Sequence, residues 1–594
     1  MKTTETDVLI VGGGGAGLTC SMLLAGLGVD SLLVSALPTT SILPKAHVLN
    51  QRAMEILADA GVADSIYARS TPAENMKAMG WYAGFVGPEP EFGRRIGKVE
   101  SWGHGNENVN WIEASPCRSA NLPQIRLEPI MKARAAALNP GRVRFHHELT
   151  ALEQDADGVS ARIRNHDTGE DYEVRARYLL GCDGGRTVGR LIGIGFEGLG
   201  VIAHTATAHV SADLSKLAPD PDVLIRWIWC PAIGEHAVLV PMGPDHWGPN
   251  SEEWVFHVSY QGDNIKDLTD DQVEKNLRLA LGLGDLPIKV HKITRWAMEG
   301  VLATKFREGR VFLVGDAAHR HPPTGGLGLT SGIQDAHNLC WKIGAVLKGQ
   351  AGDHLLDSYQ DERMAVDARN IQRSMENSIT HFEMGRAFGL QPTATAQENW
   401  TQLKKVVSGR PEDAGHRAGA LRAMRLASME ANELNVEYGY RYESAAVIPD
   451  GSPEPEPIDD IRLYEPSARP GSPLPHAWID DESGKRRPLK DLVVPGRFLL
   501  IAGEEGEAWI AAAAAVAAVS AIPLDALRIG HIDGDLFDTR LAWARYRGIS
   551  SKGAVFARPD RVVAWRSADA VDDPEAALAA ALASVLGRPV GAAA

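Results

Sequence analysis

The residues best suited to chemistry lie in three short stretches rich in glycine and acid. The first, residues 12–17, fits the pattern GxGxxG. Its first glycine permits a tight turn, its second lets the backbone approach a pyrophosphate, and its third lets a helix pack closely on a strand. We therefore predict a dinucleotide-binding turn, with a glycine-rich packing turn as the alternative. The cofactor-binding candidates are Gly12, Gly14, Ala16 and Gly17.

A second stretch, Arg310–Trp341, places an acid and a glycine-rich turn between a strand and a helix. The apolar run Val311–Val314 predicts the strand, and Leu327–Ile343 predicts the helix, which has small residues at its start. Asp316 can accept a hydroxyl proton from a ribitol-like chain. The free N–H groups at the start of the helix can hold an anion or an electron-rich ring edge. Together these features indicate a cofactor site.

The third stretch, Cys182–Thr187, reads CDGGRT and follows a further apolar run. Asp183 and Arg186 are its polar candidates, although an ordinary type I turn explains the same residues. Two more candidates lie just before a predicted helix. Lys45 can contact a pyrophosphate or a flavin edge, and His47 can act as a base near a substrate. The alternatives are a solvated lysine and a helix-capping histidine.

Hydrophobic periodicity predicts the elements that position these residues. Asp7–Val11 reads as a strand, Ala16–Leu27 as a helix and Ser31–Val34 as a second strand, which makes a βαβ unit around the first glycine turn. The second strand of such a unit usually ends in an acid that binds ribose hydroxyls. Ser35 stands at that position and makes a weaker hydrogen bond, so adenosine binding must differ in detail.

The middle of the chain, residues 200–300, alternates in the manner of antiparallel strands. Trp227 and Trp229 share one face of their strand, where they either wall an aromatic substrate pocket or form sheet core. The predicted strands are His204–Val210, Val223–Cys230, His236–Pro241, Trp254–Tyr260 and Val290–Met298.

The last third of the chain begins with long predicted helices at residues 355–385 and 395–437. A proline- and acid-rich segment, Pro453–Pro457, marks a domain boundary. Beyond Leu463 strands and helices alternate, which predicts a small α/β domain.

Composition limits the class of protein. The chain has 594 residues, more than one core can hold, so about three domains are expected. A formal net charge of −15 disfavours nucleic acid and anionic membranes as partners. The five cysteines are scattered and form no CxxC pair, so neither a disulfide framework nor a structural metal site is indicated, and a reducing, cytoplasmic location fits best. Acids precede the apolar segment at residues 8–28, which argues against a signal peptide.

The three motifs occur together and in order, and in this the chain resembles the single-component flavoprotein aromatic hydroxylases of the para-hydroxybenzoate hydroxylase type. Within that group it is similar to phenol and 2,4-dichlorophenol monooxygenases. The further matching segments are PKAHVLNQRAMEIL from Pro44, GYRY at Gly439–Tyr442 and the pattern RPD..VAW at Arg558–Trp565.

The resemblance implies a multidomain α/β and α+β fold. A Rossmann-like FAD-binding domain would comprise residues 1–80, 105–190 and 300–365, and an antiparallel-sheet substrate domain residues 81–104 and 191–299. A helical segment, 366–450, would lead to a C-terminal thioredoxin-like domain, 451–594. That domain contains no cysteine, so an interaction or homo-oligomerisation role is expected there.

The resemblance also implies the cofactor and its contacts. The pyrophosphate of FAD would bind the first motif. Gln124 stands where the glutamine of the family's LPQ sequence contacts the cofactor, and Asp316 where the family's acid meets the ribityl chain. Many relatives have Asn where Thr330 stands and Arg where Lys45 stands. Asp183 and Arg186 belong to a motif that serves both FAD and the nicotinamide donor. The backbone at Gly328, Leu329 and Thr330 would meet the isoalloxazine, and Ser35 and Leu149 are further cofactor-binding candidates.

In the implied reaction NADH or NADPH reduces the flavin, which captures O2 as a C4a-hydroperoxide and hydroxylates a phenolic or hydroxy-heteroaromatic ring. The ring must be activated, usually as a phenolate or an equivalent hydroxy-heteroaromatic, which requires a base near the phenol oxygen. His47 replaces the Asp of phenol hydroxylases, and a histidine with an ordinary pKa of about 6.5 can take the proton. The carbonyl of Pro323 would contact the ring. No metal is implied.

Three alternatives remain from the sequence. Trp227-Ile228-Trp229-Cys230-Pro231 faintly resembles the WxWxIP of flavin halogenases. The chain could also be an FAD reductase or oxidase that makes only peroxide, or a non-catalytic, flavin-bound scaffold. One sequence does not identify the substrate.

Overall fold

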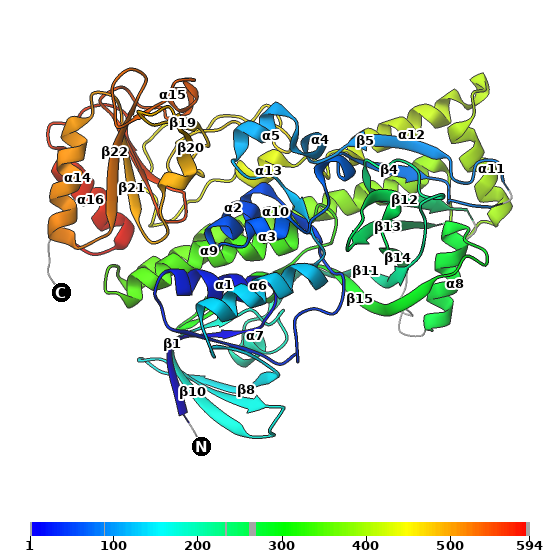
Figure 1. The fold of residues 1–594 in the computed structure, drawn as a ribbon, viewed down its shortest axis with the longest axis horizontal. Coiled ribbons are helices and arrows are strands. Elements are labelled where there is room, and N and C mark those ends of the chain that lie inside the picture. The colour runs from blue at the N-terminus through cyan, green and yellow to red at the C-terminus, as the bar shows by residue number, and fades with distance from the viewer. Residues whose placement is uncertain (1–2, 88, 232–234, 261–268, 590–594) are drawn as a thin grey trace.

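The computed structural model describes residues 3–87, 89–231, 235–260 and 269–589. Figure 1 shows a sheet domain with helix α8 at one end of the molecule, the C-terminal domain in orange and red at the other, and helices α9 and α10 between them. No helix within the described ranges is long and apolar enough to cross a membrane.

The central strands of the N-terminal sheet run parallel, and they are buried on both faces over Val8–Val11, Ser31–Ser35 and Tyr178–Gly181. Strands β1 (Thr3–Val11), β2 (Ser31–Ser35), β7 (Val143–Phe145), β10 (Asp171–Gly181) and β17 (Val311–Leu313) run in the order β17-β10-β1-β2-β7, with β16 (Arg307–Glu308) at one edge. The antiparallel ribbon of β8 (His147–Gln154) and β9 (Val159–Asn165) extends β10. In this register Val11 lies beside Gly181, and Gly181 beside Leu313. The turns that follow these three strands therefore meet at one edge.

Three helices cover one side of this sheet. Helix α1 (Gly15–Gly26) packs between α6 (Gln124–Leu138) and α9 (Leu327–Leu347). The contact with α9 is close: a Cβ built on Gly332 of α9 would lie only 3.3 Å from Cβ of Ala16 in α1. Small residues therefore let the two helices bring their N-termini together. Helix α2 (Gln51–Asp59) also packs on α9.

The middle sheet has the strand order β18-β15-β11-β14-β13-β12-β4-β5. Its strands alternate as predicted, and Trp254, Phe256 and Val258 face α8 (Asp270–Leu281) while Val255 faces α10. The bounds are β4 (Ala78–Tyr82), β5 (Arg95–Glu100), β11 (Phe196–Ser211), β12 (Val223–Cys230), β13 (Glu235–Gly243), β14 (Glu253–Tyr260), β15 (Lys289–Ala303) and β18 (His319–Arg320).

The helical region differs from the prediction at its second part. Helix α10 (Asp357–Phe388) is a single long helix as predicted, but residues 395–437 form three helices: α11 (Ala396–Val407), α12 (Ala414–Ala427) and α13 (Leu434–Tyr438). Pro411 lies at the first break and lacks the N–H that a continuous helix needs.

The C-terminal domain has a seven-stranded mixed sheet in the order β20-β19-β23-β22-β21-β24-β25. Helices α14 (Glu507–Ser520) and α16 (Pro574–Leu586) pack together beside it. The strands are β19 (Trp478–Asp480), β20 (Arg486–Pro488), β21 (Phe498–Ala502), β22 (Leu524–Gly530), β23 (Leu536–Phe537), β24 (Ala554–Ala557) and β25 (Val563–Ser567). The predicted alternation of strands and helices is present.

Candidate active site

The glycine turn after β1 has the shape of a phosphate cradle. A Cβ at Gly12 would overlap the carbonyl oxygen of Cys182, and one at Gly17 would overlap the carbonyl oxygen of Gly12. Gly14 is different, because the nearest atom to its Cβ position is Oε1 of Glu128 at 3.7 Å. Helix α1 has no side-chain cap and no acid in its first turn. Its first N–H groups therefore suit an anion that approaches over Gly14.

Glu128 borders this cradle and was not predicted from the sequence. It is buried, and it accepts hydrogen bonds from the backbone of Ser41 at 2.6 Å and from Nε2 of Gln124 at 2.7 Å. Burial raises the pKa of Glu128 above its ordinary value. A signal was present in the spacing, because residues four apart on one helix share a face.

A short two-stranded ladder unites Lys45, His47 and Gln124. Strands β3 (Val48–Leu49) and β6 (Ala120–Asn121) pair antiparallel. The pairing continues as Leu122 donates to the carbonyl of His47 at 2.7 Å and Gln124 donates to that of Ala46 at 2.9 Å. The ladder fixes His47 and Gln124 on adjacent segments, while the side chain of Lys45 is exposed.

The imidazole of His47 is held by one side chain. Its Nδ1 lies 2.5 Å from Oδ1 of Asn121, whose Nδ2 donates to Oγ1 of Thr71 at 2.7 Å. In this orientation Asn121 offers a carbonyl oxygen, so Nδ1 of His47 carries the proton and Nε2 carries the free lone pair. Burial lowers the pKa of His47, although the bond to Asn121 acts in the opposite direction. The ring is therefore a neutral base.

The turn at residues 322–326 and the start of α9 close the other side. Thr324 donates to the carbonyl of Ser374 at 2.6 Å, and Gly325 donates to Oε1 of Glu430 at 3.0 Å. Gly326, with φ +66°, precedes α9, which has no side-chain cap. The Cβ position of Gly326 lies 3.3 Å from Cβ of Val48, which places the turn beside the His47 segment.

The first turn of α9 also meets the glycine turn. A Cβ at Gly15 would lie 2.5 Å from the side chain of Leu329. Thr330 is buried and its hydroxyl donates to the carbonyl of Leu327 at 2.9 Å, within the helix. Asp316 and Pro323 are both exposed. The structure thus brings the first and second motifs together around one open edge.

The remaining predicted residues are less central. The carboxylate of Asp183 accepts N–H groups of its own turn, from Gly185 at 3.1 Å, Thr187 at 2.6 Å and Val188 at 2.9 Å. Arg186 is exposed. Ser35 is buried beside Gly13, and Leu149 lies in the core of the N-terminal domain. Among these, Ser35 lies beside Gly13 and the backbone N of Asp183 lies 2.9 Å from the Cβ position of Gly12.

Trp227 and Trp229 both project from the inner face of β12 toward α10. The ring of Trp227 stacks on His381 with centroids 3.7 Å apart, and Trp229 meets Phe388 edge-on at 5.2 Å. Both are buried in one apolar cluster with α10 and α11. Their packing fits the sheet-core interpretation at least as well as a pocket wall.

Comparison with known families gives two matches that together cover most of the chain. The FAD binding domain family matches residues 5–374, and the aromatic-ring hydroxylase C-terminal family matches residues 467–589. The chain belongs to the FAD-dependent aromatic-ring hydroxylases. The family and the overall fold predicted from the three motifs are confirmed.

Relatives of this hydroxylase have related activities. It is 36% identical to the 2,4-dichlorophenol 6-monooxygenase of Delftia acidovorans over 95% of both chains. It is 33% identical to the phenol 2-monooxygenase of a Pseudomonas species, over 97% of this chain and 92% of that one. Among solved structures, the flavin-dependent monooxygenase PieE, in complex with FAD and substrate, has a TM-score of 0.89 and 34% identity, covering 99% of this chain and 100% of that one.

The hydroxylase is therefore an FAD-dependent aromatic monooxygenase, as predicted, and the halogenase alternative is not favoured. Two features of its own structure fit FAD. The uncapped α1 N-terminus leaves room over Gly14 for a pyrophosphate. At the start of α9, both ring nitrogens of His321 are buried without a partner in the described part of the chain, and Nδ1 lies 3.7 Å from the Cβ position of Gly328.

A buried ionic cluster beneath α9 supports this edge in the hydroxylase. Asp335 accepts from the backbone of Gly315 at 2.9 Å, from His319 at 2.8 Å and from Arg363 at 2.7 Å. Burial lowers the pKa of His319, but Asp367 and Asp335 outweigh burial and raise that pKa to about 9. A charged His319 thus fixes α9 against the turn that carries Asp316. The members of this cluster are spread over 53 positions, from residue 315 to residue 367, so no local pattern in the sequence predicts it.

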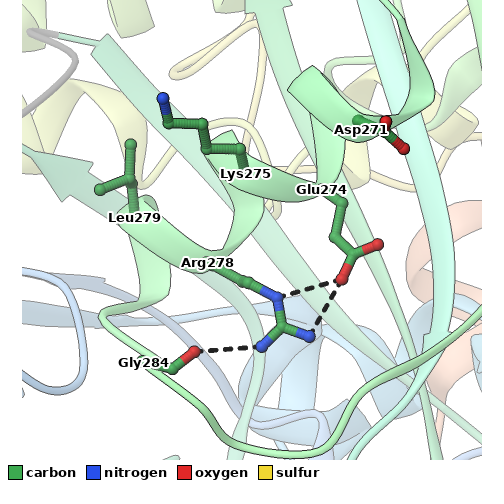
Figure 2. A pocket seen from close by; sticks show the side chains of 6 residues that line it. All are labelled: Asp271, Glu274, Lys275, Arg278, Leu279 and Gly284. Carbon is green, nitrogen blue, oxygen red and sulfur yellow. Dashed lines mark hydrogen bonds and ion pairs between the residues drawn. The ribbon is translucent and has the colours of Figure 1, made fainter.

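Two other polar groupings of the hydroxylase lie outside this site. A shallow surface hollow lies along α8, where Arg278 donates to Glu274 at 3.0 Å and to the carbonyl of Gly284 at 3.1 Å (Figure 2). Glu253 is shared by His209 at 2.6 Å and Arg126 at 2.8 Å. Arg278 in the first grouping and Glu253 in the second are thus paired within their own groupings.

Proposed function

We propose that this hydroxylase acts on a phenolic or hydroxy-heteroaromatic ring, with NADH or NADPH and O2 as co-substrates, and that His47 removes the ring-hydroxyl proton. The observation that carries the proposal is the hydrogen bond from Nδ1 of His47 to Asn121 at 2.5 Å, which leaves Nε2 free as the acceptor. Deprotonation makes the ring electron-rich, which electrophilic hydroxylation requires. Phenol and dichlorophenol, named for the relatives, are the first substrates to test.

The residues around the open edge would hold the cofactor. Bound FAD supplies hydride acceptance from the nicotinamide and activation of O2. The N–H groups beginning α1 would bind the pyrophosphate above Gly14, and those beginning α9 at Gly328–Thr330 would face the ring system. Asp316 would accept a hydrogen bond from a ribityl hydroxyl, and Gln124 and Lys45 would border the isoalloxazine ring. Pro323 would present its carbonyl to the substrate, and Arg186 would meet the nicotinamide donor.

The test compares wild type with His47→Ala. We expect the variant to retain FAD, measured by its visible absorbance, while phenol-dependent NAD(P)H oxidation at neutral pH falls by about 10²- to 10⁴-fold, the usual contribution of a general base. Product mass should show one added oxygen in wild type. Unchanged turnover in the variant would refute the role of His47. Stoichiometric peroxide with every phenol would favour the oxidase alternative.

We further propose the four-part domain division set out from the sequence, with a homo-oligomer formed through the C-terminal domain. The segment that precedes the C-terminal sheet supports a domain boundary there, because residues 439–477 contain neither helix nor strand. All five cysteines are free, which supports a reducing cytoplasmic location. Light scattering of the full chain at several concentrations would test the oligomer.

A further inference from the structure

A cluster of two histidines and a glutamate spans three neighbouring strands of the middle sheet. His209 lies on β11, Glu253 begins β14 and His291 lies on β15, and the strand order places β11 between the other two. Each side chain offers an atom that can bind a metal ion, and these atoms all lie within 4.8 Å of one another. Strand pairing thus gathers potential ligands from residues that are far apart in sequence.

A β-bulge in β15 turns His291 toward His209. Lys292 pairs with His209 and Val290 pairs with Val210, so His291 is an extra residue between two paired positions. A bulge of this kind re-aims a side chain. The imidazole of His291 accordingly lies beside that of His209, with the ring centroids 4.7 Å apart.

The hydrogen bonds of the cluster leave potential ligand atoms unused. Oε2 of Glu253 lies 2.6 Å from Nε2 of His209 and accepts from Nη2 of Arg126 at 2.8 Å, whereas Oε1 accepts from none of the residues that the structure describes. Nε2 of His291 lies 2.6 Å from Oγ of Ser211, and Nδ1 of that ring makes no hydrogen bond within the same ranges.

Two of the three side chains are in the protonation state that metals require. Desolvation is the first cause that lowers the pKa of His291, and the charge of His209 is the second, so the ring of His291 is neutral near pH 7. The hydrogen bond with His209 is the first cause that lowers the pKa of Glu253 to about 2, so this carboxyl is ionised. A neutral imidazole and an ionised carboxylate are the forms that bind metal ions.

The ligand types select the kind of ion. Imidazole nitrogen suits Zn²⁺, Co²⁺, Ni²⁺ and Cu²⁺, whereas Mg²⁺ and Ca²⁺ prefer sites made of oxygen. The positive charges of Arg126 and Lys289 beside a single carboxylate also disfavour a purely ionic site. Tetrahedral Zn²⁺ with bonds of about 2.1 Å holds its ligand atoms about 3.4 Å apart. Because His291 is exposed, rotation of its ring can close the remaining distance.

We propose that His209, Glu253 and His291 bind one divalent transition-metal ion of the zinc type, with water completing the coordination. Ser211 and Arg126 would be outer partners that orient His291 and Glu253. Because Arg126 belongs to α6, the ion would also strengthen the contact between the middle sheet and the N-terminal domain. A cluster without a ligand explains the pairing of His209 with Glu253, but it gives no reason for the bulge that places His291 beside them.

The test titrates the untagged, FAD-loaded protein with Co²⁺ after treatment with a chelator. Wild type should bind one ion per chain, seen as new visible bands beyond the flavin absorption and as a saturating calorimetric signal. His291→Gln and Glu253→Gln should each weaken binding by about tenfold or more, since loss of an outer partner alone costs about that much. Ser211→Ala should weaken binding by about tenfold for that reason. FAD content reports on folding in each variant.

Thermal unfolding gives a second measurement. Zn²⁺ should raise the unfolding temperature of wild type, because an ion that binds only the folded state stabilises it by mass action. The rise should be smaller in His291→Gln at the same concentration of Zn²⁺. His246→Gln is the matched control, because it removes an exposed histidine that is paired with Glu252, and this variant should respond as wild type does.

The proposal is overturned if chelator-treated wild type binds neither Co²⁺ nor Zn²⁺ at millimolar concentrations. It is also overturned if His291→Gln and Glu253→Gln bind as tightly as wild type, because the ion would then lie elsewhere. If Glu253→Gln loses FAD, the exposed His291→Gln alone decides the outcome. None of these measurements uses turnover, so the metal site and the proposed reaction can fail separately.

Discussion

The base role proposed for His47 requires its ring to be neutral and held in one tautomer. Burial lowers the pKa of His47, so the ring stays neutral at pH values below the ordinary pKa of a histidine. We expect the acid limb of kcat/KM for phenol to have its midpoint below about 6.5. The limb should be absent in His47→Gln, measured as initial rates of NAD(P)H oxidation across pH.

Asn121 provides a second test of the same base. The bond to Asn121 raises the pKa of His47, so Asn121→Leu should move the acid limb to still lower pH. The rate at neutral pH should nevertheless fall by about tenfold, because the ring is free to adopt the wrong tautomer. FAD content should not change. A limb that moves to higher pH would contradict this account of the His47–Asn121 pair.

The glycines of the first motif separate cofactor binding from folding. In Gly14→Ala the new Cβ meets only Glu128 at 3.7 Å, and φ is −87°, which alanine accepts. The free energy of unfolding of the apo variant should lie within about 1 kcal/mol of that of apo wild type. Its FAD affinity should fall by about tenfold or more, because the new methyl group displaces the pyrophosphate. Gly17→Ala, whose Cβ would overlap the carbonyl of Gly12, should lower the stability of the apo protein itself. Thermal unfolding and FAD titration measure both.

Helix α9 begins at the open edge where the first and second motifs meet. It is fixed to the turn after β17 by Asp335, with His319, Arg363 and Asp367 around it. The folded pKa of His319, about 9, exceeds its unfolded value. The stability that charged His319 contributes is therefore fully present below pH 6.5 and is lost as pH rises toward 9.

This gives a prediction for stability rather than activity. The free energy of unfolding of the wild type should fall by on the order of 3 kcal/mol between about pH 6.5 and 9 through this group. His319→Gln should remove that part of the slope, and His291→Gln, an exposed control, should retain it. Denaturant unfolding at several pH values provides the measurement. An identical slope in His319→Gln would rule out the charged state of His319.

The elements themselves were largely predictable, and their contacts were not. The turn at Gly12–Gly17 and the start of α9 are local features, set by glycine, acid and apolar residues that are adjacent in sequence. His47 could be singled out by its type and position. Asn121, which fixes its tautomer, lies 74 residues away, and His209 and His291 are brought together only by strand pairing. Long-range side-chain contacts leave no spacing pattern in one sequence.

At the scale of the molecule, the C-terminal domain is joined to helices α2 and α10 by buried charges. Glu362 of α10 accepts from Arg558 of the C-terminal domain at 2.5 Å and 2.9 Å and from Lys342 of α9 at 2.8 Å. A second link runs from Lys490 to Glu55 of α2 at 2.7 Å. All five groups are buried. Buried ion pairs therefore connect the C-terminal domain to α2 and α10, and through Glu362 to α9.

Removing one partner of such a cluster is more damaging than removing a surface pair, because a buried charge is left uncompensated. Arg558→Met should destabilise the protein by about 3–5 kcal/mol. FAD affinity should fall as well, since α9, the helix proposed to face the flavin, is tied to Glu362 through Lys342. Arg540→Met, which breaks a half-exposed pair with Asp480 at 3.2 Å in the same domain, should change stability by less than about 1 kcal/mol. Unfolding of the full chain with and without FAD measures both effects. If Arg558→Met loses stability but keeps its FAD affinity, the C-terminal domain holds the fold together without setting the position of α9.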